Sequence, residues 1–159
     1  MNIVFDISSF QLINLIFLES KRNIIMDGTF TKIIYSNPSL SLNSIYCYLP
    51  IELQSVDKIA NKYFLKFYPS NVINMPIVQE LSKIEYKIIE YYKQINHINK
   101  KTTCLLTKQL YSGNLKIYRD YTDYNSKINK NIQYIIKISG IWETYNEIGI
   151  TYKIFECYE

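Results

Sequence analysis

Apolar and polar positions alternate most clearly near the C-terminal end of the chain, over residues 135–155. This stretch is dense in β-branched and aromatic residues, the types that favour a pleated, half-buried surface. Two such runs meet at the short polar break Tyr145-Asn146-Glu147. The pattern predicts a terminal β-hairpin that closes the fold.

Further strands are expected in both halves of the chain. Asp27-Gly28 lies between β-rich flanks and predicts a hairpin, because both central residues of a type I′ turn need positive φ. Residues 21–23 precede it as a polar turn. In 62–68, Tyr63, Leu65 and Phe67 share one side of a predicted strand. The remaining predicted strands cover 40–49, 102–111, 115–118 and 10–19, and a short helix is the alternative for 10–19.

One helix is predicted, from about residue 76 to residue 96. Pro76 suits its first position, and Asn74 is the expected N-cap. Apolar residues recur at spacings of three, four or their sum and form one stripe: Ile77, Leu81, Ile84, Ile88 and Ile95. The pattern is typical of an amphipathic helix that lies on a sheet.

The order of these elements predicts an α+β fold, in which a mostly antiparallel β-barrel or sandwich carries one amphipathic helix at about 76–96. Hairpin signals dominate, and regular alternation of strands with helices is absent. The order is compatible with the oligonucleotide-binding (OB) barrel, which has one helix between its third and fourth strands, and equally with a sandwich. At 159 residues the chain is expected to form a single domain, 1–159.

Composition adds an excess of tyrosine and a mild positive charge. The chain has 16 tyrosines, 48% hydrophobic residues and a formal net charge of +4. The excess of Ile, Asn, Lys and Tyr also fits a genome rich in A and T. The positive charge is concentrated between residues 100 and 137, where only Asp120 and Asp123 oppose these basic residues: Lys100, Lys101, Lys108, Lys116, Arg119, Lys127, Lys130 and Lys137.

The same segment interleaves basic and aromatic residues, as a surface for single-stranded nucleic acid requires. Lysine and arginine side chains contact the phosphates along the strand, and aromatic rings stack on the bases. Residues 119–131 are polar and predict a long exposed loop. The predicted site consists of Lys108, Lys116, Tyr118, Arg119, Tyr121, Tyr124, Lys127, Lys130 and Trp142. For Trp142 and for the lysines, a core position and a solvated surface are the respective alternatives.

Catalytic and metal chemistry find little support in the sequence. Cys47, Cys104 and Cys157 are widely spaced, and His97 is the sole histidine, so a structural zinc site or a disulfide framework is not expected. No phosphate-binding loop, dinucleotide fingerprint or zinc-protease motif occurs. We expect neither an enzyme nor a cofactor. Dispersed carboxylates leave a two-metal nuclease as a remote alternative.

The chain reads as a soluble intracellular protein without a membrane partner. Its first residues lack a positively charged segment, and Asp6 interrupts their apolar run, unlike a signal peptide. No apolar run reaches the roughly 18 residues that a membrane-spanning helix needs.

Two stretches support a resemblance: Ile136-Lys-Ile-Ser-Gly-Ile-Trp-Glu143 with Gly149-Ile-Thr-Tyr-Lys-Ile154, and Thr107-Lys-Gln-Leu-Tyr-Ser-Gly-Asn-Leu-Lys-Ile-Tyr118. They resemble segments of small, poorly characterised proteins of large DNA viruses. The resemblance implies a viral protein in the cytoplasm or nucleus of an infected cell, with an OB-like role in binding single-stranded DNA.

Two hypotheses follow from the sequence. The first is a sequence-tolerant binding protein for single-stranded DNA or RNA. The second is a structural viral protein that self-associates as a homo-oligomer through strand edges and tyrosine-rich surfaces. Strand faces alternate, so a register error of one residue would move Lys116 and Tyr118 to the opposite face.

Overall fold

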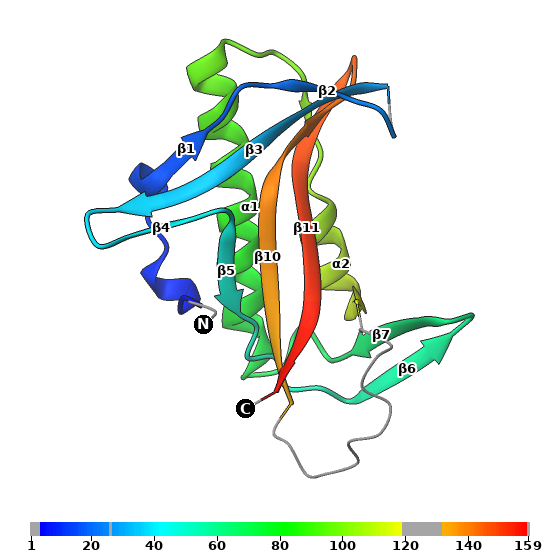
Figure 1. The fold of residues 1–159 in the computed structure, drawn as a ribbon. Coiled ribbons are helices and arrows are strands. Elements are labelled where there is room, and N and C mark those ends of the chain that lie inside the picture. Colours follow the sequence, from blue (N-terminus) through cyan, green and yellow to red (C-terminus); the bar gives the residue numbers. More distant parts are fainter. Residues whose placement is uncertain (1–3, 26, 119–131, 159) are drawn as a thin grey trace.

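The computed structural model describes residues 4–25, 27–118 and 132–158, and Figure 1 shows its fold. The elements within these ranges are, in order, the 3-10 turns η1 (Ile7–Ser9) and η2 (Leu12–Asn14), then β1 (Leu15–Phe17), β2 (Lys21–Asn23), β3 (Gly28–Asn37), β4 (Leu40–Leu42), β5 (Ile45–Tyr48), β6 (Ser55–Ile59), β7 (Lys62–Lys66), α1 (Asn74–Asn96), β8 (Lys101–Thr102), α2 (Leu105–Ser112), β9 (Asn114–Ile117), β10 (Ile132–Glu143) and β11 (Glu147–Tyr158).

Within the described ranges, eight strands form one mostly antiparallel sheet that curls into a half-barrel. Its main path runs β1-β3-β10-β11-β8, with β2 and β4 beside β3 and with β5 beside β10. Only the pairing of β8 with β11 is parallel among these described strands. Strands β6, β7 and β9 form a separate small antiparallel sheet. The predicted α+β class with mostly antiparallel β-structure is confirmed.

The predicted terminal hairpin is confirmed as β10 and β11, and a bulge divides it into two halves. The pairing register shifts between Ile138 and Gly140. On the turn side of the bulge β10 pairs with β3, and on the other side it pairs with β5. A Cβ on Gly140 would overlap the carbonyl oxygen of Thr31, so glycine permits β3 to approach at this point.

The hairpin predicted around Asp27-Gly28 is confirmed, but its type I′ turn is wrong. Asn23 pairs with Gly28, so the connection is longer than two residues, and Gly28 is itself a strand residue. The structure does place a two-residue turn with positive φ between β6 and β7. Ala60 (φ 47°) and Asn61 (φ 64°) form this turn, and they connect the paired residues Ile59 and Lys62.

Two neighbouring predictions about the N-terminal part are also corrected. Residues 21–23, predicted as a turn, form β2 because they pair along β3. Of the strand predicted over 10–19, only Leu15–Phe17 is strand, and η2 precedes it. Both corrections follow from the length of β3. This strand pairs with both β1 and β2, and the local sequence of these short segments does not indicate such pairing.

The predicted helix is confirmed as α1, which begins two residues earlier than expected. Asn74 is not the N-cap: it lies inside the helix, and its backbone N–H donates to Asn71 Oδ1 (2.6 Å). The buried amide of Asn74 accepts from the N–H of Glu52 (2.7 Å) and donates to the carbonyls of Glu52 and Tyr68 (both 3.0 Å). Asn74 therefore anchors α1 to the chain before and after β7.

The prediction of a single helix is wrong, because α2 replaces the strand expected over 102–111. Leu106 and Leu110 are both fully buried, as an i, i+4 pair on one helix face. The first turn is capped from another element: Glu85 of α1 accepts hydrogen bonds from the N–H groups of Leu106 (3.0 Å) and Thr107 (2.8 Å). Gly113 ends the helix with φ 69°.

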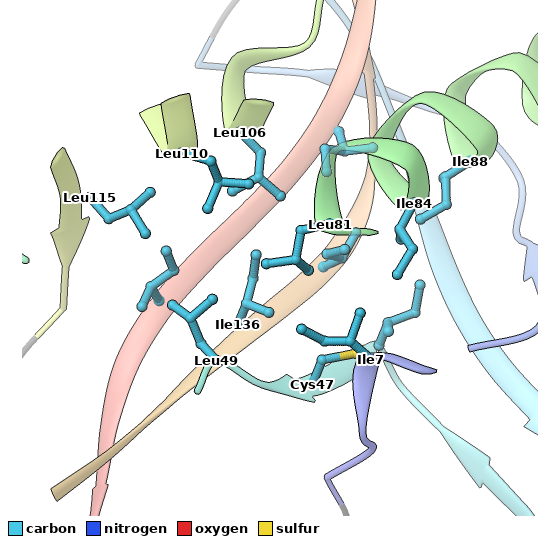
Figure 2. Close-up of a cluster of buried hydrophobic side chains, with 14 of the residues drawn as sticks. Ile7, Cys47, Leu49, Leu81, Ile84, Ile88, Leu106, Leu110, Leu115 and Ile136 are labelled. Carbon is cyan, nitrogen blue, oxygen red and sulfur yellow. The ribbon is translucent and has the colours of Figure 1, made fainter. Parts of the chain in front are cut away.

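Both helices lie on one side of the β10–β11 hairpin, behind it in Figure 1. Figure 2 shows the core on this side, where Leu81 and Ile84 of α1, Leu110 of α2 and Leu115 of β9 gather with Ile136 of β10. The opposite side of the hairpin carries no helix among the described residues. We call it the outer face.

No helix within the described ranges is long and apolar enough to span a membrane.

Candidate nucleic-acid interface

The predicted site residues divide into two groups. One group lies outside the described residues: Arg119, Tyr121, Tyr124, Lys127 and Lys130. The other group falls on different elements: Lys108 in α2, Lys116 in β9, Tyr118 directly after β9, and Trp142 in β10.

Tyr118 joins the small sheet to the large one. Its backbone N–H donates to the carbonyl of Ile154 in β11 (2.8 Å), and it forms an isolated parallel bridge with Phe155. Its side chain remains 47% exposed. The Nζ atom of Lys116 lies 4.9 Å from the centre of the Tyr118 ring, and that of Lys153 lies 5.0 Å away. Two cations from different sheets thus share one exposed aromatic ring.

From Lys153, a row of basic and aromatic side chains continues across the large sheet. Lys153 in β11 is directly opposite Lys137 in β10, and Lys137 is directly opposite Tyr46 in β5. The Nζ atom of Lys137 lies 5.6 Å from the centre of the Tyr46 ring. Directly opposite residues of antiparallel strands place their side chains on the same face. The row therefore places one aromatic and two cationic side chains next to each other across three strands.

On the other side of Tyr118 the row extends into the small sheet, where Lys116 is directly opposite Phe64 in β7. We name the complete row the outer strip and define it by these residues: Tyr46, Lys137, Lys153, Tyr118, Lys116 and Phe64. Its six members come from both sheets and are all partly or fully exposed.

Strand alternation places the outer strip on the outer face. In β10, Ile136 and Ile138 flank Lys137 and are buried in the core with the helices. In β9, Leu115 and Ile117 flank Lys116 and are buried there too. Since successive side chains of a strand point to opposite faces, the lysines between these apolar residues point away from α1 and α2.

Among the described residues, no carboxylate forms an ion pair with a lysine of the outer strip. The ion pairs among described residues are Lys93–Glu90, Lys100–Glu143 and Lys101–Glu147, and none includes a lysine of the strip. The deeply buried carboxylates, Glu85 and Glu143, are on the helix side. Among the described residues, Asp57 of β6 is directly opposite Phe64 at the end of the strip. Such a surface attracts polyanions.

Lys108 and Trp142 do not join the strip. Lys108 is exposed on α2, in the helix layer. Trp142 is on the outer face but near the hairpin turn, about 16 Å along β10 from Lys137 at about 3.3 Å per residue. Its indole lies against Gly149, where an added Cβ would be 2.5 Å from Cζ2, and its Nε1–H donates to the carbonyl of Ile150 (3.0 Å). Trp142 is half-buried and its donor is satisfied.

The sequence prediction missed Tyr46, Lys153 and Phe64 as site residues and did not include Lys137. A local signal existed for the two strand lysines, since each interrupts an apolar run of a predicted strand. The partners across the strands could not be assigned, because the pairing of Lys137 with Lys153 depends on the bulge at residue 139.

Two of the three cysteines have thiols of low reactivity. Burial raises the pKa of the Cys47 thiol to about 12 and that of the Cys104 thiol to about 11, so both are protonated at neutral pH and are poor nucleophiles. His97 ends α1 in the left-handed conformation (φ 54°), with its backbone N–H directed to the carbonyl of Lys93. Among the described residues, no three His, Cys, Asp or Glu side chains converge to hold a metal.

Comparison with known proteins returned no relative: no protein-family model, no curated protein and no solved structure matches this chain.

Proposed function

We propose that this protein binds single-stranded nucleic acid on the outer strip, without regard to sequence. The observation that supports the proposal most strongly is the exposed ring of Tyr118 between the ammonium groups of Lys116 and Lys153. Lysines contact phosphates, and an exposed aromatic ring offers a face to any base. A binding protein without catalysis also agrees with the role implied by the resemblance to small proteins of large DNA viruses.

An OB barrel is not needed for this function. The strip crosses an open half-barrel and a small sheet, and open β-surfaces with exposed aromatics are a general platform for unpaired bases. The OB assignment stays a prediction. In either architecture, the strand faces rather than the helices contact the ligand.

The test is fluorescence polarisation of a labelled oligo-dT and of its duplex form, at low and at physiological salt. We expect the single strand to bind more tightly than the duplex, and its affinity to fall as salt rises. Equal binding of both forms, or no binding at low salt, would contradict the proposal.

Replacing Tyr118 by alanine is expected to weaken single-strand binding by roughly 5- to 150-fold, since stacking on one base contributes about 1–3 kcal/mol. The backbone of Tyr118 keeps its hydrogen bond to Ile154, so the fold should be retained. Tyr86→Ala is the matched control, because Tyr86 is 55% exposed on α1. Polarisation titrations of Tyr118→Ala that overlay those of the wild type would remove stacking from the account.

Self-assembly is the second candidate function, and the edge strand β6 is the observation that favours it. β6 pairs only with β7 among the described strands, and it exposes Val56 (39%) and Ile59 (54%). Exposed apolar edges favour strand-to-strand association. Oligomers that persist at high salt, together with the absence of oligo-dT binding, would select this function.

A further inference from the structure

Lys137 and Lys153 form a like-charged pair in the middle of the outer strip. They are directly opposite each other on two antiparallel strands. Opposite residues have Cβ atoms about 4.5–5.5 Å apart, and like charges in this arrangement destabilise a sheet. Neither lysine has a carboxylate partner among the described residues. No carboxylate within the described part of the chain therefore neutralises either lysine.

The two ammonium groups turn to opposite sides. Lys137 reaches toward Tyr46, on the β5 side of β10, and Lys153 reaches toward Tyr118, on the far side of β11. Three interstrand spacings of about 4.8 Å separate the two tyrosines, so they are about 14 Å apart with the lysines between them. The arrangement is nearly symmetric: aromatic, cation, cation, aromatic.

We propose that the Lys137–Lys153 pair is a phosphodiester-binding subsite, and that Tyr46 and Tyr118 receive the bases on the two sides of that phosphate. An anion that draws both ammonium groups inward from the tyrosine rings would replace their repulsion with two charge-assisted hydrogen bonds. Bases that leave the backbone in opposite directions cannot be paired in a duplex, so the ligand is a single strand. The identity of the ligand rests on the proposed function, whereas the anion site rests on the lysine pair alone.

The repulsion between Lys137 and Lys153 should lower the melting temperature of the unliganded protein. Lys137→Gln, Lys153→Gln or both should raise the melting temperature at low salt by about 1–3 °C, and the gain should vanish at high salt. The matched control for the single variants is Lys83→Gln alone, at an exposed lysine of α1, because replacing Lys87 as well would remove a like-charged pair at i, i+4. A melting temperature that falls in the pair variants, or rises as much in the control, would overturn the repulsive pairing.

The binding test compares three proteins with a labelled oligo-dT of about 12 nucleotides: the wild type, Lys137→Gln/Lys153→Gln and the Lys83→Gln/Lys87→Gln control. The pair variant should lower the slope of log affinity against log salt by about 0.7, since the subsite holds one phosphate and each single-strand phosphate contact contributes about 0.7. The control should keep the wild-type slope. Equal slopes in all three proteins would overturn the subsite while leaving the proposed function intact.

A second probe separates failure of the subsite from failure of the function. If oligo-dT does not bind the wild type, the proposed function fails. Pyrophosphate then tests the anion site alone: thermal stabilisation of the wild type and the control, but not of the pair variant, would support it. Equal stabilisation of all three, or of none, would overturn it.

Discussion

Replacing Gly28 by alanine is expected to lower the free energy of unfolding by about 3 kcal/mol or more, the upper end of the range for overpacking. A Cβ at this position would overlap the backbone carbonyl oxygen of Glu143 and lie 3.3 Å from the Cα of Thr144. Backbone cannot rotate away as a side chain can. The strands β3 and β10 would have to separate at the pairing of Thr29 with Glu143.

This separation would also disturb a buried polar network. The carboxylate of Glu143 accepts hydrogen bonds from Lys100 Nζ (3.0 Å), Tyr92 Oη (3.2 Å) and Thr29 Oγ1 (3.3 Å). The network links α1, β3 and β10, and a buried charge that loses partners is costly.

Thermal or urea unfolding measures the effect. Gly28→Ala should lower the melting temperature by about 6–12 °C, using about 2–4 °C per kcal/mol for a chain of this size. Asp27→Ala is the control, because Asp27 is exposed in the same hairpin connection and should change the melting temperature little. A melting temperature of Gly28→Ala equal to that of the control would show that the close approach is not required.

Replacing Glu85 by alanine is expected to destabilise the protein by about 2–3 kcal/mol. Its fully buried carboxylate accepts from the N–H groups of Leu106 (3.0 Å) and Thr107 (2.8 Å) and from Thr107 Oγ1 (2.6 Å). Alanine would leave these donors of α2 buried without an acceptor. Hydrogen bonds to charged groups contribute about 1.5–3 kcal/mol each. Part of this loss is offset because the variant no longer buries a charged carboxylate.

Urea unfolding with a probe of α2 checks this prediction. Glu90→Ala is the control, since Glu90 is half-buried on the same helix and bonds to Thr102 and Lys93 instead. Equal stability of Glu85→Ala and Glu90→Ala would mean that the contact from α1 does not hold α2.

The pH dependence gives a second view of Glu85. Burial raises the pKa of its carboxyl above 4.5, against the hydrogen bonds from Thr107 and Leu106, which lower it. The folded protein therefore binds this proton more tightly than the unfolded chain does, and Glu85 favours folding more as pH falls toward 4.5. In urea titrations, the free energy of unfolding of the wild type relative to that of Glu85→Gln should increase as the pH is lowered toward 4.5. A difference that is constant with pH would contradict the raised pKa.

Elements with strong local periodicity could be predicted from the sequence. The stripe that includes Leu81 and Ile88 marks α1, and the β-rich runs on either side of Tyr145 mark the terminal hairpin. In both elements the residue type at each position indicates whether that residue faces the core or the solvent, because burial follows the period of the element.

The second helix could not be predicted because its stabilising contact is distant in sequence. Residues 105–112 include Leu106 and Leu110 at helical spacing, but also Thr107 and Tyr111, which suit a strand. The cap comes from Glu85, on a different helix, and only the folded chain brings it to the first turn of α2.

The outer strip depends on a single irregularity. Without the bulge between Ile138 and Gly140, the register near the turn would continue, and Lys137 would lie opposite Ile154, a core residue. The extra residue on β10 brings Lys137 opposite Lys153 and keeps both on the outer face. Periodicity gives the side of a residue within one strand, and it cannot give the partner across a bulge.

The most direct test of the account is to locate the contact. An oligo-dT that carries 5-iododeoxyuridine is irradiated in complex with the protein, and the crosslinked residues are identified by mass spectrometry. The outer strip predicts crosslinks at Tyr118 and Tyr46. Crosslinks confined to exposed tyrosines of the helices, Tyr86 in α1 and Tyr111 in α2, would contradict the account.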